Sequence, residues 1–124
     1  MLYHKNIPVQ NEKLWAAVRD VTPFADRDGD VWHLSIKPTD FAALTKSGQE
    51  DKLVDWACGR IWACVPAGTD MRQYMEGISG HATLVRGAAT RPRFEPEAAP
   101  LAKLAAGLRQ QFDPRGILNP GLMG

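Results

Sequence analysis

The spacing of apolar residues changes along this chain, and each spacing predicts a different element. In residues 11–21 the apolar positions recur every three or four residues, which indicates a helix lying on a core, and Pro23 ends that helix. Residues 31–37, VWHLSIK, alternate between apolar and polar side chains and therefore predict a strand with two unlike faces. Pro38 and the apolar residues after it predict a short helix that Gly48 terminates.

The middle of the chain predicts three more strands and a second covering helix. The apolar runs 52–58 and 60–65 are separated by one glycine and are best joined as a tight antiparallel hairpin. Thr69 is a suitable N-cap for a helix over 70–78. Residues 81–87 alternate again and predict the last strand. The resulting order is strand, helix, strand, strand, helix, strand.

This order is that of the ferredoxin-like βαββαβ fold, which belongs to the α+β class. Its four-stranded antiparallel sheet carries two helices on one face and leaves the other face free to meet a ligand or a partner. The helix predicted at 11–21 precedes this unit in the sequence. We therefore expect functional side chains on the face opposite the two covering helices.

The strongest helical pattern lies near the C-terminus. One face of a helix from about Ala98 carries the apolar residues Leu101, Leu104, Leu108 and Phe112. The helix stops before Asp113-Pro114, because a proline disfavours helical geometry in the residue ahead of it. Residues 88–100 hold three prolines without an apolar period and predict an extended connection.

Composition narrows the class of protein. A chain of 124 residues with 44% hydrophobic residues fits one domain, so we expect 1–124 to form a single domain. A formal net charge of +1, with both signs interspersed, argues against nucleic acid as the main partner. Cys58 and Cys64 are expected to be reduced and buried. The sequence has neither an apolar stretch of signal-peptide length nor a window long enough for a membrane span, so we expect a soluble cytoplasmic protein.

Alternation within the strands predicts which side chains share the open face. If Trp32, Leu34 and Ile36 face the helices, the residues between and after them lie on the other side. That face is expected to carry His33, Ser35, Lys37, His81 and Thr83. The hairpin adds Arg60 and Trp62 on one parity and Asp55 on the other, with the register of its turn left open. A solvated outer face of a sheet has a similar composition, so the pattern alone leaves a purely structural interpretation open.

Several of these side chains suit the binding or oxidation of a small acid. An imidazole such as that of His81 can take a proton near neutral pH, although the residues alone favour a hydrogen-bonded histidine at a strand end. Arg60, Lys37 and Arg86 could each hold a carboxylate. The three histidines and two cysteines lack the short spacings of a metal site, so we predict no structural zinc. The sequence also lacks GxSxG, Walker and GxGxxG motifs.

Four segments carry a resemblance to a known family. The C-terminal run FDPRGILNPG, residues 112–121, resembles the closing motif of FAD-linked oxidases of the vanillyl-alcohol oxidase type. Residues 31–38, 55–62 and 80–86 look like the C-terminal half, the cap domain, of the FAD-binding subunit of glycolate oxidases. The resemblance runs from about Leu14 to Gly124.

The resemblance implies an activity, a cofactor and partners. Such enzymes oxidise glycolate to glyoxylate with FAD, whose diphosphate is held by an N-terminal domain that these 124 residues do not contain. The matching positions imply that Asn119, Pro120 and Gly121 approach the flavin, and that His81 and Thr83 lie near its ring. Arg60 or Lys37 would hold the substrate carboxylate.

The implied partners are a second flavin subunit and an iron-sulfur subunit, which could make the protein peripheral to the inner membrane. No cysteine pattern here suits an iron-sulfur cluster, so a cluster would belong to the partner. His33 stands where similar proteins tend to have an arginine, which weakens an anchoring role at that position.

Two other functions fit the same pattern. The open face could be a docking surface without catalytic residues, and an isolated domain could self-associate through it. An RNA-recognition module has the same strand order, but its glycine and aromatic motif is missing here and the net charge is nearly neutral.

Overall fold

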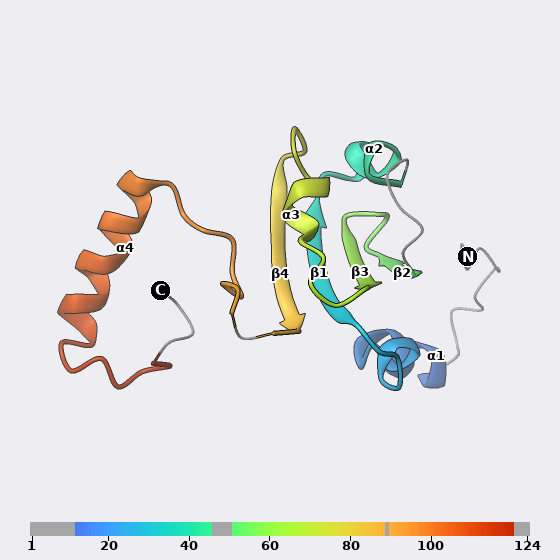
Figure 1. Cartoon of the computed structure of the whole chain (residues 1–124), viewed down its shortest axis with the longest axis horizontal. Helices are drawn as coiled ribbons and strands as arrows, with labels where there is room; N and C mark the ends of the chain where they lie inside the picture. Colours follow the sequence, from blue (N-terminus) through green and yellow to red (C-terminus); the bar gives the residue numbers. More distant parts are fainter. Residues whose placement is uncertain (1–11, 46–50, 89, 121–124) are drawn as a thin grey trace.

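A computed structural model describes residues 12–45, 51–88 and 90–120. Its centre is a four-stranded sheet in the order β2-β3-β1-β4, in which each strand pairs antiparallel with its neighbour (Figure 1). The strands are β1 (Asp30–Ile36), β2 (Asp51–Asp55), β3 (Arg60–Val65) and β4 (Gly80–Arg86). This order confirms the predicted ferredoxin-like α+β fold.

Two short helices cover one face of the sheet. A 3₁₀ turn, η2 (Pro38–Asp40), leads into α2 (Phe41–Thr45), and α3 (Met71–Tyr74) connects β3 to β4. The core lies between these helices and the sheet, as the alternation in β1 predicts. Its buried members are Trp32, Leu34, Ile36, Leu44, Ile61, Ala63, Val65, Met71, Met75, Ala82 and Leu84.

Several element boundaries differ from the prediction. The helix predicted over 11–21 ends at Arg19, before Val21, which has a φ of 52°. The other large differences are in α3 and β2. The helix predicted over 70–78 ends at Tyr74, and Asp70 rather than Thr69 is its N-cap, because the Asp70 carboxylate accepts a hydrogen bond from the Arg72 amide at 3.1 Å. The helix cannot continue to 78 because Gly77 has a φ of 80°, in the left-handed region. Strand β2 ends at Asp55, three residues early, because residues 56–58 all have positive φ and form the hairpin turn.

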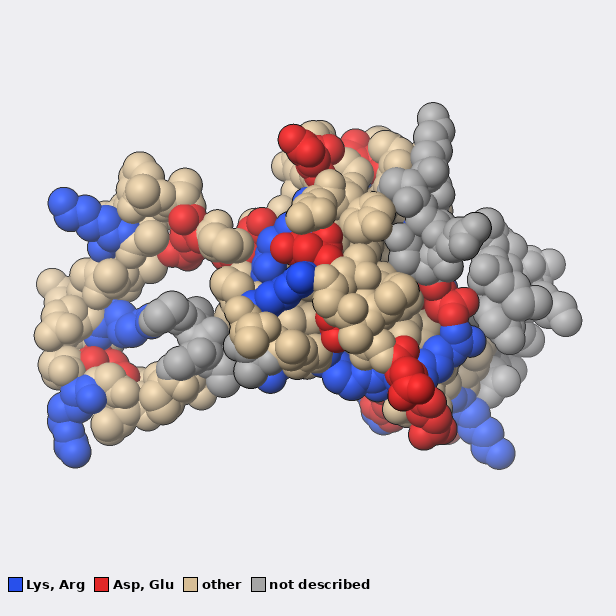
Figure 2. Space-filling view, in the orientation of Figure 1, with Lys and Arg blue, Asp and Glu red and all other residues tan. Residues whose placement is uncertain are grey.

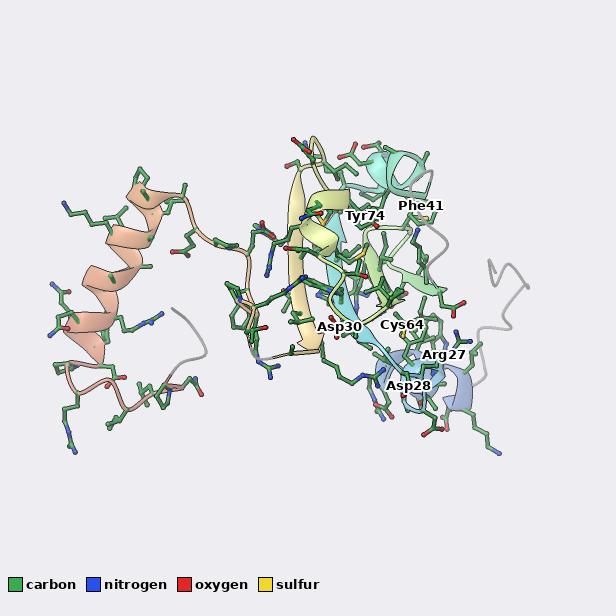
Figure 3. The ribbon with its side chains drawn as sticks, in the orientation of Figure 1. Arg27, Asp28, Asp30, Phe41, Cys64 and Tyr74 are labelled. Carbon is green, nitrogen blue, oxygen red and sulfur yellow. The ribbon has the colours of Figure 1, made fainter. Side chains whose placement is uncertain are left out.

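Among the described residues, the opposite face is covered at one end only. There α1 (Glu12–Arg19) and the 3₁₀ turn η1 (Thr22–Phe24) precede β1. Phe24 packs in a second cluster with Val31 and Cys64, both from the open face of the sheet. Cys64 is buried and donates to the Asp28 carbonyl at 3.7 Å, close to Asp30 at the start of β1 (Figure 3).

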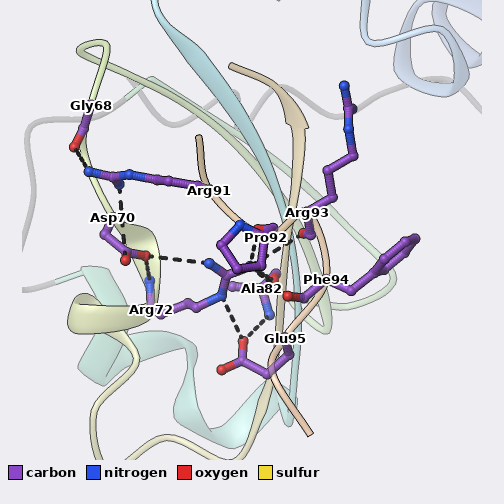
Figure 4. Close-up of polar contacts among 9 residues, drawn as sticks. All are labelled: Gly68, Asp70, Arg72, Ala82, Arg91, Pro92, Arg93, Phe94 and Glu95. Atoms are coloured by element: carbon purple, nitrogen blue, oxygen red, sulfur yellow. Dashed lines mark hydrogen bonds and ion pairs between the residues drawn. The ribbon is translucent and has the colours of Figure 1, made fainter. Parts of the chain in front are cut away.

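The predicted extended connection is fastened to the outer edge of β4. The Leu84 amide donates to the Arg93 carbonyl at 2.7 Å, and the Ala82 amide donates to Glu95 Oε2 at 3.2 Å (Figure 4). Arg72 reaches the same segment and donates to the Pro92 carbonyl at 2.9 Å. The segment therefore protects a strand edge that would otherwise be open to pairing with another chain.

Helix α4 (Ala99–Phe112) stands apart from the sheet (Figure 1). None of its residues is buried, and its predicted apolar stripe faces solvent. The exposed large apolar residues of this helix and the tail after it are Leu101, Leu104, Leu108, Phe112, Ile117 and Leu118.

The face of the molecule seen in Figure 2 shows no large field of one sign. In the view of Figure 2, acidic and basic side chains are interspersed over the sheet domain. Within the described residues, no helix is long and apolar enough to cross a membrane. Both cysteines are free thiols, but only Cys64 is buried; Cys58 is half-buried in the hairpin turn, which corrects that part of the prediction.

Candidate functional site

The register of the strands places four polar side chains in one row across the open face. Asp55 of β2 pairs with Arg60 of β3, Arg60 pairs with Ser35 of β1, and Ser35 pairs with His81 of β4. Since neighbouring strands lie about 4.8 Å apart, the backbones of Arg60 and His81 are separated by roughly 10 Å across Ser35. A guanidinium, a hydroxyl and an imidazole therefore reach the same small region.

The next row contains the aromatic residues of this face. Leu53 pairs with Trp62, Trp62 with His33, and His33 with Thr83. The rings of His33 and Trp62 are tilted at 48° with centroids 4.7 Å apart. Burial, and then the positive charge of Arg60, lower the pKa of His33, so its imidazole is neutral at neutral pH.

Arg60 lies between two indole rings. Its Cζ atom is 5.0 Å from the ring centroid of Trp56 and 5.7 Å from that of Trp62, distances at which a guanidinium is attracted to an aromatic face. The Nε of Arg60 and the Nε1 of Trp62 are both buried and lack a hydrogen-bond partner in the structure. Because the chain itself covers these two nitrogens, the terminal nitrogens of Arg60 are the part of its guanidinium that a ligand with acceptor oxygens could reach.

An apolar hollow of about 230 Å³ lies on the same face, beside Trp62. It opens between β1, β3 and β4 on one side and the turn after α1 on the other. Its lining residues are Asp20, Val21, Phe24, Ala25, Val31, Trp62, Val85 and Arg86.

Sequence reasoning and structure agree on part of this face. His81 is exposed on β4, Thr83 is half-buried two residues along the same strand, and Arg60 is half-buried on β3. The structure brings these three predicted residues to one surface. Lys37 is exposed but lies just beyond β1, as the residue that begins η2.

The predicted cofactor residues of the tail lie elsewhere. Asn119 and Pro120 are exposed and follow α4, the helix that stands apart from the sheet in Figure 1. Gly121 lies outside the described residues. Asn119 has a φ of 47°, and the tail before it folds back on Asp113, whose carboxylate accepts hydrogen bonds from two backbone amides. The tail is therefore a formed loop that the chain itself does not bring to the open face.

Arg86 has a structural role. Its guanidinium donates to the carbonyl oxygens of Phe24, Ala25, Arg27 and Gly29. Because its nitrogens are engaged by these four carbonyls, Arg86 fastens the loop before β1 and is poorly suited to hold a substrate.

Two features of the site could not be read from the sequence. The four-residue hairpin turn 56–59 sets Asp55 opposite Arg60, so that Asp55 joins the open face on the same side as Arg60 rather than the opposite one. The same turn folds Trp56 back over Arg60. A three-residue or five-residue loop would have shifted the register by one residue and placed Asp55 and Arg60 on opposite faces, from nearly the same apolar pattern.

A metal centre finds no support in the described part of the chain. No group of three or more His, Cys, Asp or Glu side chains there could hold an ion. Acid–base and carboxylate-binding groups are what the open face offers.

Comparison with known proteins identifies a relative. Over 113 residues the chain is 32% identical to glycolate oxidase subunit GlcE of Escherichia coli (strain K12). The aligned region covers 90% of this chain and 31% of that protein, so the chain spans about a third of its relative's length. No family model matches the chain. No solved structure matches it. The predicted relation to this glycolate oxidase protein is therefore confirmed at the level of distant homology.

Proposed function

We propose that this chain is the cap domain, over residues 1–124, of an FAD-dependent oxidase that converts glycolate to glyoxylate. The observation that carries the proposal is the similarity to glycolate oxidase subunit GlcE along 90% of the chain. The open face supports it, because a cap needs a surface of mixed aromatic and polar side chains turned towards the cofactor and the substrate.

The described residues suit part of an FAD molecule. Trp62 and His33 offer flat rings on the open face, and the guanidinium of Arg60 lies beside the Trp62 ring. These groups would lie against the flavin ring or the substrate, while the diphosphate and ribityl chain would be held by the rest of the oxidase. When bound, the flavin supplies the hydride acceptor of the reaction.

The chain's own residues would bind the substrate and move its proton. Arg60 would hold the carboxylate of the 2-hydroxy acid, with its fork already oriented by two indoles. His81, exposed in the same row, would take the hydroxyl proton, and Thr83 would assist in positioning. Lys37, just beyond the strand, is the alternative cation for the carboxylate.

Kinetics of the complete oxidase test these roles. We expect Arg60→Lys to raise KM for glycolate with a smaller change in kcat, and His81→Gln to lower kcat by about 10²-fold or more. Gln73→Ala, exposed on the helix-covered side, is the matched control and should leave both constants unchanged. Unaltered kinetics in both site variants would remove the open face from the reaction.

A docking role is the second candidate, favoured by the exposed stripe of α4. Leu104 is 66% exposed and Phe112 is 81% exposed, and residues of that kind in a row mark a contact surface. In this function α4 packs against the rest of the oxidase or another protein of the complex, and the open face holds no reacting group. Leu104→Glu should then abolish assembly, whereas Arg60→Lys and His81→Gln should leave turnover of the assembled enzyme intact.

A further inference from the structure

The apolar hollow and the Arg60 guanidinium both adjoin the indole of Trp62. Trp62 lines the hollow, and Cζ of Arg60 is 5.7 Å from the centroid of the same ring. A positive group and an apolar recess thus face a common strip of surface. A ligand that carries a carboxylate at one end and an apolar group at the other matches this arrangement.

The walls of the hollow favour an apolar occupant. Phe24 and Val31 form fixed walls, because they are only 4% and 5% exposed, whereas Val85 at the side is 45% exposed. These side chains offer dispersion contacts and no hydrogen bond. Burying an apolar group of a ligand there would strengthen binding in proportion to the area removed from water.

The two charged residues at the rim are already engaged. Asp20 accepts two hydrogen bonds from Arg19, at 2.7 and 2.9 Å, and Arg86 donates to four backbone carbonyls. Neither therefore competes with Arg60 for a carboxylate. A carboxylate would accept from the terminal nitrogens of Arg60, because the Nε of Arg60 and the Nε1 of Trp62 are covered by the chain itself.

We propose that the open face binds 2-hydroxy acids with a branched or aromatic side chain in preference to glycolate. The carboxylate would lie on Arg60, and the side chain would enter the hollow beside Trp62. Glycolate has no side chain and would leave the hollow empty. The preference deepens the proposed oxidase function and rests on it for the identity of the reaction, but the binding is a property of this chain.

Binding to the 124-residue chain tests the proposal directly. Indole fluorescence would be recorded during titration with glycolate and with 2-hydroxy-4-methylpentanoate. A fully buried methylene contributes about fourfold in affinity, so the branched acid should bind at least about tenfold more tightly than glycolate. Arg60→Lys should weaken both acids by about tenfold, because the bidentate contact is lost.

A substitution that fills the hollow separates the contribution of the hollow to the binding affinity from the contribution of Arg60. Val85→Phe starts from a partly exposed position and should reduce the affinity for the branched acid to that for glycolate, leaving glycolate unchanged. Gln73→Phe adds the same ring on the helix-covered side and should change neither affinity. Urea midpoints of the two variants close to that of the parent chain would show that both are folded.

Each result decides for or against the hollow. Equal affinities for the two acids, no saturable binding of either, or an unaffected Val85→Phe variant would overturn the proposal. The oxidase function is tested separately by turnover with flavin. Selective binding without oxidation of any 2-hydroxy acid would refute that function alone, whereas glycolate turnover without selective binding would refute the hollow alone.

Discussion

The guanidinium carbon of Arg72 lies 4.9 Å from the ring centre of Trp32, the largest fully buried side chain of the core. The same guanidinium donates to the carbonyls of Pro92 and Phe94, both at 2.9 Å, and its Nε is 3.4 Å from Glu95 Oε2 (Figure 4). Arg72 thus joins the core of the sheet to the segment that covers the edge of β4.

Arg72→Ala should destabilise the chain by about 2–4 kcal/mol, because it removes charge-assisted hydrogen bonds and a buried cation–π contact together. Urea unfolding measures the loss, and hydrogen exchange should show residues 91–95 released first. Arg19→Ala removes an exposed pair with Asp20 and should leave the midpoint unchanged. An Arg72→Ala chain as stable as the parent would mean that the segment is held by β4 alone.

The pKa of His33 provides a test of the aromatic row. Burial and then Arg60 lower this pKa below the unfolded value of 6.5, so the unfolded chain binds the proton more readily. Stability should therefore be greatest above pH 6.5, fall as the pH drops below it, and level off below the folded pKa. His33→Gln should remove this dependence, which urea midpoints between pH 5 and 7.5 would reveal.

Arg60→Gln should raise the pKa of His33 part of the way towards 6.5, because burial remains after the charge is removed. Titration of the imidazole by NMR, assigned with the His33→Gln variant, measures the shift. The same pKa in the parent and in Arg60→Gln would show that the guanidinium does not act on His33.

The hairpin turn stores backbone strain that a glycine would relieve. Trp56, Ala57 and Cys58 have φ values of 52°, 50° and 71°, a conformation disfavoured in residues with a Cβ. Ala57→Gly should stabilise the chain by about 0.5–1 kcal/mol, the relief of strain exceeding the added unfolded-state entropy. Ala67→Gly, at an exposed loop position without positive φ, should not stabilise in the same thermal-unfolding experiment.

The sequence predicted the structure best where the same requirement, burial on one side of the sheet, applied to many residues. Burial of one sheet face fixed the alternation around Trp32 and Leu34, and the order of elements then led to the fold and to the shared face of Arg60 and His81. No repeated burial pattern constrains the turn after Asp55. The pairing of Asp55 with Arg60 and the position of Trp56 were therefore not predictable from the sequence.

Helix α4 was predicted from the sequence, but its packing partner was not. Its stripe was correctly predicted as helical, yet the pattern gives no information on what the stripe packs against. Leu104 and Leu108 face solvent in this chain.

The tail loop that presents Asn119 depends on one carboxylate. Asp113 accepts hydrogen bonds from the Leu118 amide at 2.8 Å and the Ile117 amide at 3.0 Å, and these bonds lower its pKa below the ordinary 3.8. A carboxylate with a lowered folded pKa stabilises the loop above about pH 3.8 and loses that contribution as the pH falls through the folded value.

Asp113→Asn should therefore unfold the loop even at neutral pH, seen as lost exchange protection of the Ile117 and Leu118 amides, while the sheet keeps its protection. Asp26→Asn, an exposed carboxylate in the loop before β1, is the control and should leave both amides protected. If Asn119 approaches the flavin, Asp113→Asn should also lower turnover of the complete oxidase as strongly as Asn119→Ala. Full turnover with an unfolded loop would assign Asp113 to local structure alone and remove the tail from the flavin site.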